Sequence, residues 1–302
     1  LNQDTLKESV GYCIYRTSNA FVPMTRYEFD AESDMDMYVY SKDSRDHYVE
    51  LTDVKGQVDV DHVSFDYEGE LDVLHDVDLH IKAGETLAVV GPSGGGKSTL
   101  CKLIPRFYDA SQGSVCIDGV DVKDYTLDEL RHKVGVVPQK AVLFAGTIAD
   151  NIRWGKQDAT EAEIDEALEI AQAKEFVDGK ENGIYFKITQ GGKNLSGGQK
   201  QRLTIARAVV RKPEILILDD SASALDFATD AALRKAIREK TKGMTVFLVS
   251  QRASTIMNSD KIIVMDDGQI AGIGTHRQLL SNCEIYREIC QSQLSEEEMY
   301  HE

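Results

Sequence analysis

The chain has 302 residues, of which 42% are hydrophobic and 28% are charged, an ordinary composition for a globular protein. Its formal net charge of −17 argues against a role in which a basic surface binds the nucleic-acid backbone, so we expect no nucleic-acid partner. No run approaches the roughly 18 apolar residues that a membrane-spanning helix needs, and no signal-peptide pattern is present. The cysteines show no CxxC spacing, which predicts reduced thiols at Cys13, Cys101, Cys116, Cys283 and Cys290.

Residues 1–55 are rich in Asp, Tyr and Ser, and their apolar residues follow no clear period. This composition predicts an N-terminal segment of unknown role, either a linker or the start of a poorly ordered segment. Because the chain begins with Leu1 rather than Met, we expect it to be part of a longer protein.

From Gln57 onward the pattern becomes regular. Short runs rich in apolar and β-branched residues predict strands over residues 57–67, 86–90, 114–122 (a hairpin around Asp118-Gly119), 133–137, 215–218, 245–250 and 261–265. Residues 160–177 predict an amphipathic helix, since apolar residues stand at positions 164, 167, 168 and 171. Apolar strands separated by helical segments favour a mostly parallel sheet covered on both faces.

A phosphate-binding loop is predicted directly after the strand at 86–90. The sequence GPSGGGKS, residues 91–98, fits G-x-x-x-x-G-K-[ST] between a strand and a helix-like segment. In such a loop glycines allow backbone N–H groups to surround phosphate oxygens, Lys97 supplies positive charge, and Ser98 supplies a hydroxyl ligand for Mg²⁺. The predicted nucleotide-binding residues here are Gly91, Ser93, Gly94, Gly95, Gly96, Lys97, Ser98 and Thr99.

The apolar run ILIL at 215–218 ends in two carboxylates, Asp219 and Asp220. Beside a phosphate loop, an Asp at the tip of such a strand is suited to hold Mg²⁺. We therefore predict that Asp219 and Ser98 are metal ligands.

The sequence NLSGGQKQR, residues 194–202, resembles the signature motif of the ABC ATPases. Ser196 and Gln199 have the spacing of a capping box that opens a helix, and Pro213 stops that helix. The motif is specific because it lies between a phosphate loop and the ILILDD strand. The signature residues are Leu195, Ser196, Gly197, Gly198 and Gln199.

The resemblance implies an α/β fold, the P-loop NTPase of the ABC ATPase type, over residues 56–290. It implies a RecA-like core with a mostly parallel sheet, an antiparallel β subdomain, and a helical subdomain at about 140–211. An acidic C-terminal tail, residues 291–302, would follow.

The resemblance also implies roles for single residues and for partners. Tyr67 would stack on adenine, Gln139 would sense Mg²⁺ and communicate with membrane domains, and Asp226 would lie in a loop joining two monomers. Residues 142–155, VLFAGTIADNIRWG, are similar to the corresponding exporter segment. ATP would bind in a head-to-tail dimer, between the phosphate loop of one ATP-binding domain and the signature of the other. The chain would work with transmembrane domains, at the cytoplasmic face of the cell membrane.

Two positions depart from the family pattern. Asp220 stands where a glutamate usually acts as general base, and Gln251 stands where a histidine usually contacts the γ-phosphate. Asp is shorter by one methylene, and a neutral amide cannot carry an imidazolium charge. Both changes together resemble the degenerate half of a heterodimeric bacterial exporter of drugs or lipids. We therefore expect an ATP hydrolase coupled to transport whose own site, with Asp220 and Gln251 at the catalytic positions, turns over slowly.

Two alternatives remain open. The chain could be a nucleotide-dependent regulatory clamp without significant ATPase activity, which differs from the first reading in whether the isolated chain hydrolyses ATP. It could also be an ABC ATPase of the DNA repair or translation type, but such proteins have a long coiled coil or tandem ABC units with basic surface, and this sequence has neither.

Overall fold

The computed structural model describes residues 56–67, 73–221, 223–241 and 243–300, together with four short strands nearer the N-terminus. These are β1 (Tyr12–Thr17), β2 (Ala20–Met24), β3 (Met37–Lys42) and β4 (Tyr48–Leu51). They form an antiparallel sheet in the order β2-β1-β3-β4. The sequence shows no strand period in this segment, and the role of residues 1–55 stays a prediction.

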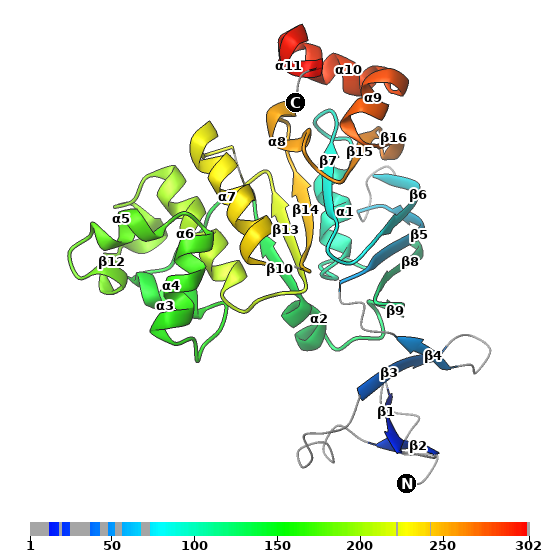
Figure 1. Cartoon of the computed structure of the whole chain (residues 1–302), viewed down its shortest axis with the longest axis horizontal. Helices are drawn as coiled ribbons and strands as arrows, with labels where there is room; N and C mark the ends of the chain where they lie inside the picture. The colour runs from blue at the N-terminus through cyan, green and yellow to red at the C-terminus, as the bar shows by residue number, and fades with distance from the viewer. Residues whose placement is uncertain are drawn as a thin grey trace.

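The central element is a six-stranded sheet in the order β10-β13-β14-β7-β15-β16 (Figure 1). Its strands are β7 (Thr86–Val90), β10 (Val134–Val137), β13 (Ile215–Asp219), β14 (Thr245–Val249), β15 (Lys261–Asp266) and β16 (Gln269–Gly274). The first five strands of that order run parallel, and β16 pairs antiparallel with β15. This pairing confirms the predicted, mostly parallel sheet. Its strands are apolar throughout because both faces of a parallel sheet are covered by other elements.

A second, antiparallel sheet has the order β6-β5-β8-β9. Its strands are β5 (Val58–Phe65), β6 (Leu74–Ile81), β8 (Gln112–Ile117) and β9 (Val120–Asp121). Asp118 and Gly119 have φ angles of 53° and 77°, the left-handed conformations that a two-residue hairpin requires, as predicted. Strand β6 was not predicted from the sequence, although its buried Val77, Leu79 and Ile81 alternate with polar residues.

The two faces of the main sheet pack against different partners. Helix α1 (Lys97–Leu103) and the antiparallel sheet bury one face, and α7 (Phe227–Lys240) packs on the other. In β7 the side chains alternate, so that Leu87 and Val89 join the first core while Ala88 and Val90 face the C-terminal helices. The short helices α2 (Leu127–Lys133) and α8 (Ala253–Ile256) precede β10 and β15.

A mainly helical part lies at one side of the main sheet, within the predicted range of about 140–211 (Figure 1). It contains the helices α3 (Ile148–Arg153), α4 (Glu161–Ile170), α5 (Lys174–Asp178) and α6 (Gly197–Val209). Between them stand the strands β11 (Gly146–Thr147) and β12 (Lys187–Ile188) and the 3₁₀ turns η3 (Gly183–Tyr185) and η4 (Gln190–Gly192).

The single helix predicted over 160–177 is wrong in its length, because two helices, α4 and α5, occupy this range. Gln172 separates them with a left-handed φ of 55°. Its neighbour Ala173 donates its N–H back to the Leu168 carbonyl at 2.7 Å, which terminates α4 in the manner of a C-terminal cap. The apolar positions used for the prediction all lie in α4 or directly after it, so they carry no information on the second helix.

The C-terminal helices are α9 (His276–Asn282), α10 (Glu284–Gln291) and α11 (Glu296–Tyr300). Together with α8 they cover the second face of β7 and β15 and bury Tyr286, Cys290 and Met299. Part of the predicted acidic tail therefore packs on the domain through Met299. No helix in the described part of the chain is both long and apolar enough to cross a membrane.

Gly155 is required where α3 approaches α6. A Cβ atom at this position would lie 2.0 Å from the Arg207 carbonyl oxygen and 2.9 Å from Val210 Cγ1. We expect Gly155→Ala to lower the free energy of unfolding by about 1–3 kcal/mol, because the backbone of α6 must move. Gly179→Ala is the matched control, since its Cβ would meet the nearest atom at an ordinary 3.6 Å. Equal stability of the two variants in urea denaturation would contradict the prediction.

Candidate nucleotide-binding site

The predicted phosphate loop connects β7 to α1 and lies against the end of β15. Gly91 has a φ of 146°, and a Cβ there would lie 1.9 Å from the Met265 carbonyl oxygen. Gly96, at φ 88°, would bring a Cβ within 2.6 Å of Leu74 Cδ2. Both positions therefore need glycine for conformation and for space. Gly94, also at positive φ, faces open space, and α1 begins without a side-chain cap on its first N–H groups. Uncapped N–H groups at the start of a helix attract anions.

Lys97 is held inside this loop. Its residue is only 8% exposed, and its Nζ donates hydrogen bonds to the carbonyl oxygens of Gly91 (2.9 Å) and Pro92. Burial lowers the pKa of Lys97, and the carboxylates of Asp219 and Asp220 act in the opposite direction. A buried ammonium group at this place is suited to an anionic ligand such as the outer phosphates of a nucleotide.

Ser98 and Asp219, the two predicted metal ligands, meet across the ends of α1 and β13. Ser98 Oγ donates a hydrogen bond of 2.9 Å to Asp219 Oδ1. Burial raises the pKa of Asp219, while the bond from Ser98 and the charges of Lys102 and Lys97 act to lower it. A hydroxyl oxygen and a carboxylate side by side are oxygen ligands of the kind Mg²⁺ prefers, so this pair fits the ion. Their function as metal ligands stays a prediction.

Gln139 and Asp220 form a second pair at the same edge of the sheet. Gln139 Nε2 donates a hydrogen bond of 2.9 Å to Asp220 Oδ2. Asp220 has a left-handed φ of 46°, unusual for a residue other than glycine, and its N–H bonds the Val249 carbonyl at 2.9 Å. Strand β13 ends at Asp219, and Asp220 lies directly after it in this strained conformation. The sequence brings Gln139 to the predicted metal site, whereas in this structure its amide contacts Asp220.

Tyr67 lies beside the first turn of α1. Its hydroxyl is 3.3 Å from Thr99 Oγ1, and its ring meets Phe65 and Tyr108 edge-on, with centroids 4.8 and 5.1 Å apart. The sequence reasoning missed Tyr108, which is 43% exposed next to Tyr67. The adjacent aromatic pair Phe107-Tyr108 was the available signal. The adenine-stacking role of Tyr67 stays a prediction.

The signature motif opens α6 as predicted. Ser196 Oγ accepts the N–H of Gln199, and Gln199 Oε1 accepts the N–H of Ser196, which completes the capping box. Leu195 is buried in the core of the helical part, whereas Ser196 and Gly197 are exposed and a Cβ on Gly197 would meet no atom within 4 Å. Exposed backbone at the start of a helix is available to an anion from outside.

Within one chain the signature stays apart from the phosphate loop. In Figure 1 the helices α1 and α6 stand on opposite sides of β13 and β14. No hydrogen bond joins residues 195–199 to residues 91–99 in the described part of the chain. The signature and the phosphate loop therefore lie on separate surfaces of the domain.

Hydrogen bonds from Arg252 join the loop containing Asp226 to the segment containing Gln251. Asp226 caps α7 by accepting the N–H of Thr229 at 2.9 Å, and hydrogen bonds from Thr229 lower the pKa of Asp226. Arg252 donates to the carbonyl oxygens of Ser223 and Leu225, at 3.0 Å each, and stacks its guanidinium over Phe227. Gln251 itself is exposed. Arg252 was missed from the sequence, because these contacts are to backbone atoms that leave no residue pattern.

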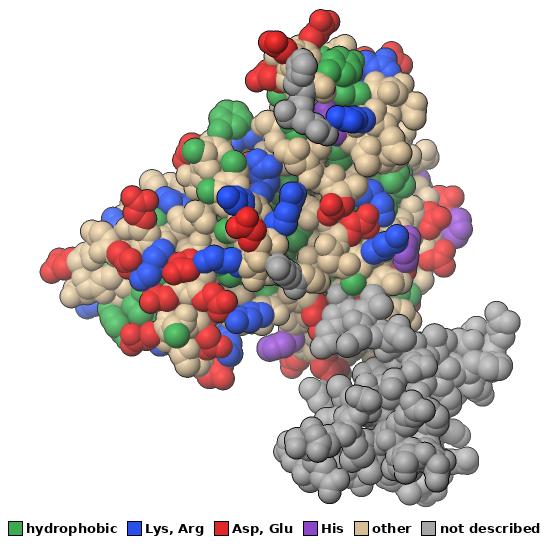
Figure 2. Space-filling view, viewed as in Figure 1, with side chains coloured by type: hydrophobic (Ala, Val, Ile, Leu, Met, Phe, Trp, Pro, Cys, Tyr) green, Lys and Arg blue, Asp and Glu red, His purple; other side chains and the backbone are tan. Residues whose placement is uncertain are grey.

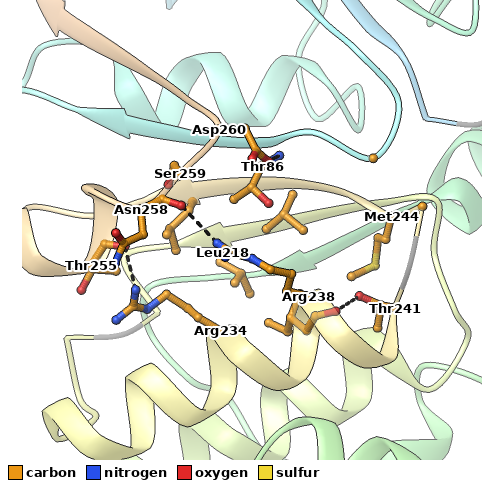
Figure 3. Close-up of a pocket in the computed structure, with 15 residues that line it drawn as sticks. Thr86, Leu218, Arg234, Arg238, Thr241, Met244, Thr255, Asn258, Ser259 and Asp260 are labelled. Atoms are coloured by element: carbon orange, nitrogen blue, oxygen red, sulfur yellow. Dashed lines mark hydrogen bonds between the residues drawn. The ribbon is translucent and has the colours of Figure 1, made fainter. Parts of the chain in front are cut away.

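A cavity of about 220 Å³ lies away from these residues, between α7 and the strands β13 and β14 (Figure 3). Arg234 donates to the Thr255 carbonyl at 3.2 Å, and Arg238 to the Asn258 carbonyl at 3.1 Å. None of the predicted site residues lines this cavity. Figure 2, viewed from the same side as Figure 1, shows acidic and basic side chains interspersed over the surface of the helical part.

These features define a P-loop nucleotide-binding domain: a parallel sheet, a phosphate loop that leads from one of its strands into a helix, and a hydroxyl and an aspartate beside that loop. Comparison with known proteins narrows this class. Residues 74–223 match the family model described as ABC transporter. This domain belongs to the ABC transporter family, and the chain carries the ATP-binding domain of such a transporter.

Individual relatives agree with this assignment. The chain is 44% identical over 256 residues to an uncharacterized ABC transporter ATP-binding protein of Bacillus subtilis, covering 85% of this chain and 44% of the relative. It is 44% identical over 236 residues to a putative multidrug export ATP-binding/permease protein of Staphylococcus aureus, covering 78% of this chain and 41% of the relative. A bacterial Atm1-family ABC exporter, solved with ATP bound, aligns with a TM-score of 0.77 at 39% identity, covering 80% of this chain and 43% of that one. The chain thus spans less than half the length of these relatives.

Lys97→Ala tests the site directly. Removal of the ammonium group would take away the full positive charge that the loop offers to bound phosphates, and we expect affinity for ATP to fall roughly a hundredfold or more. Lys102→Ala, on the same helix, is the matched control and should bind ATP nearly as the unaltered chain does. Calorimetric titration with Mg-ATP measures both, and unchanged affinity in Lys97→Ala would contradict the assignment.

Proposed function

We propose that this chain is the ATP-binding part of an ABC exporter and that its Mg-ATP binding drives transport through transmembrane domains. The observation that carries the proposal is the convergence of Lys97, Ser98 and Asp219, three residues from α1 and β13, at the carboxyl edge of a parallel sheet. The export names carried by several relatives support the direction of transport. Since those relatives are more than twice as long, the rest of such a protein would supply the transmembrane domains.

Two copies of the domain would be needed for each complete ATP site. Ser196 and Gly197 are exposed and separate from the chain's own phosphate loop, so the start of α6 is accessible to an ATP held by another domain. In a head-to-tail pair, the signature of one domain covers the phosphates bound to the loop of the other. The exposed Asp226 loop, next to Gly198 through the Ala224 carbonyl, would lie in the same interface.

The surface for the transmembrane domains would lie close to Gln139. Val142, Phe144 and Trp154 are exposed there, Phe144 and Trp154 stack with centroids 4.8 Å apart, and Arg207 lies over the Phe144 ring. Such an exposed aromatic group favours a protein contact. Gln139 bonds Asp220 on one side and begins the segment leading to this surface on the other, so it could transmit a change at the nucleotide to the transporter.

Each residue of the site would have a distinct task in hydrolysis. Lys97 would hold the outer phosphates, Ser98 and Asp219 would hold Mg²⁺, and Mg²⁺ when bound would neutralise charge on the phosphate oxygens. Asp220 would accept a hydrogen bond from the attacking water, and Gln251 would donate one to the γ-phosphate. Catalysis of this kind depends on positioning more than on covalent chemistry.

Hydrolysis at this chain's own site would be slow. Asp220 is one methylene shorter than glutamate, and in the present structure its Oδ2 is already engaged by Gln139. Gln251 is neutral at every pH and cannot supply the charge of a protonated histidine. We therefore propose a heterodimer in which this chain binds ATP stably and completes a faster site on a non-identical partner. Undetectable turnover by the isolated chain with tight ATP binding would instead favour a regulatory clamp.

Replacing both atypical residues tests this proposal. We expect Asp220→Glu with Gln251→His to raise ATP turnover roughly a hundredfold, because a correctly placed base and a charged γ-phosphate contact are restored. The measurement is steady-state phosphate release at protein concentrations that favour dimers. Asp219→Glu is the matched control, since lengthening the neighbouring carboxylate should give no gain. If the double variant is no faster than the unaltered chain, its slow turnover has another cause.

A complementation experiment tests the head-to-tail arrangement. Adding Ser196→Ala to that faster double variant should reduce its turnover roughly a hundredfold, because every site then lacks an intact signature. Excess unaltered chain should restore turnover, since it brings an intact signature and only a slow site of its own.

Thr160→Ala, placed in the same background, controls for loss of a helix cap. Thr160 forms the same capping box at α4 that Ser196 forms at α6, so any general effect on helix stability is matched. This control should keep its turnover. Failure of the unaltered chain to restore the Ser196→Ala variant would refute the head-to-tail pairing.

A further inference from the structure

A glutamine near the C-terminus holds the segment that carries Gln251. Gln293 Oε1 accepts the N–H of Ala253 at 3.0 Å, and Gln293 Nε2 donates to the Gln251 carbonyl oxygen at 2.7 Å. The two bonds reach the backbone on either side of Arg252, where the chain passes from β14 into α8. Both the donor and the acceptor of one side-chain amide are therefore used on a three-residue stretch.

The helix that receives these bonds has no cap of its own. Its N-cap residue is Arg252, whose side chain makes no capping hydrogen bond. The first N–H of α8, that of Ala253, is satisfied instead by Gln293, 40 residues further along the chain. Helix starts without a local cap depend on such substitutes, because an unpaired N–H group costs free energy.

Other contacts fix the rest of this segment. Ser250 donates its N–H to the Val89 carbonyl at 3.2 Å, which ties the segment to β7, and Arg252 ties it to the loop before α7. Gln293 adds the connection to a third element. The side chain of Gln251 has no hydrogen-bond partner in the described part of the chain, so its direction depends on how the backbone beneath it is held.

Gln293 is itself placed by the packing of the C-terminal helices. Its N–H bonds the Cys290 carbonyl at 3.0 Å in the turn after α10. Tyr286 and Cys290 of α10 are buried in one cluster with Ala253 and Ile256 of α8. His276 of α9 contacts both other C-terminal helices: its Nδ1 lies 2.8 Å from Tyr286 Oη in α10, and its Nε2 lies 3.0 Å from the Met299 carbonyl oxygen in α11.

We propose that Gln293 is a positioning residue for the nucleotide site: it orients Gln251 toward the γ-phosphate by holding the backbone of residues 251–253. This inference rests on the proposed function, since it takes Gln251 as the γ-phosphate contact. It makes α9, α10 and α11 part of the response to ATP, so that a partner or modification moving these helices alters nucleotide discrimination without touching the phosphate loop.

The test is the ratio of ATP affinity to ADP affinity, because only ATP has the γ-phosphate. Mg-ATP and Mg-ADP are titrated calorimetrically into the full chain and into Gln293→Ala. Loss of a hydrogen-bonded contact of ordinary strength predicts a ratio roughly three- to tenfold lower, with ADP affinity unchanged. This readout needs no hydrolysis, so it applies to a slow site.

Gln293→Glu divides the two bonds. A carboxylate still accepts from Ala253 but presents an acceptor to the Gln251 carbonyl, so we expect its ratio to fall at least as far as that of Gln293→Ala. Gln291→Ala is the matched control: it is the same residue type two positions earlier, exposed, and has no described side-chain contact. Its ratio and melting temperature should equal those of the unaltered chain.

A double-mutant cycle shows whether Gln293 acts through Gln251. In Gln251→Ala, adding Gln293→Ala should lower the ratio no further. The proposal is overturned if the ratio of Gln293→Ala stays unchanged, if ATP and ADP weaken equally, or if the two substitutions act additively. Lys97→Ala, titrated alongside, keeps the two ideas distinguishable, since ATP binding that survives this change refutes the nucleotide site itself rather than the role of Gln293.

Discussion

The hydrogen bond between Ser98 and Asp219 marks the constraint on which the rest of the structure depends. It joins residues 121 positions apart, and it forms because β7 and β13 run parallel and end at the same edge of one sheet. A parallel sheet needs cover on both faces, which α1 and α7 provide. Every element that reaches the site therefore does so from the carboxyl end of a strand, where loops are free to carry polar side chains.

Strain and burial concentrate at this edge. Gly91 approaches the backbone of Met265 more closely than any side chain would permit, Lys97 is buried against carbonyl oxygens, and Asp220 adopts a left-handed backbone. Each of these features costs stability in isolation and is maintained by the apolar packing beneath it. Burial shifts the pKa of Lys97 downward and that of Asp219 upward, so both groups gain from ligands of opposite charge.

Much of this arrangement could be predicted from the sequence because the signals are local. The glycine spacing of the phosphate loop, the alternation of β5, the apolar runs of β7, β13, β14 and β15, and the capping box of Ser196 depend on neighbouring residues only. The failures also have local causes. Gln172 ends α4 through a backbone conformation that the apolar period does not indicate. In β6 the buried residues are interrupted by two histidines and two aspartates, so no continuous apolar run marks the strand.

The sequence by itself determined the class of the domain and the chemistry of its ligand site, since a phosphate loop and a signature motif are short stretches in which residue type decides local geometry. Only the tertiary structure decided which of those residues meet. Gln139 reaches Asp220 across 81 positions, and Gln293 reaches Ala253 across 40. Contacts of this kind depend on strand order and helix packing, and one of the four atoms involved, the Ala253 nitrogen, belongs to the backbone, which is the same in every residue.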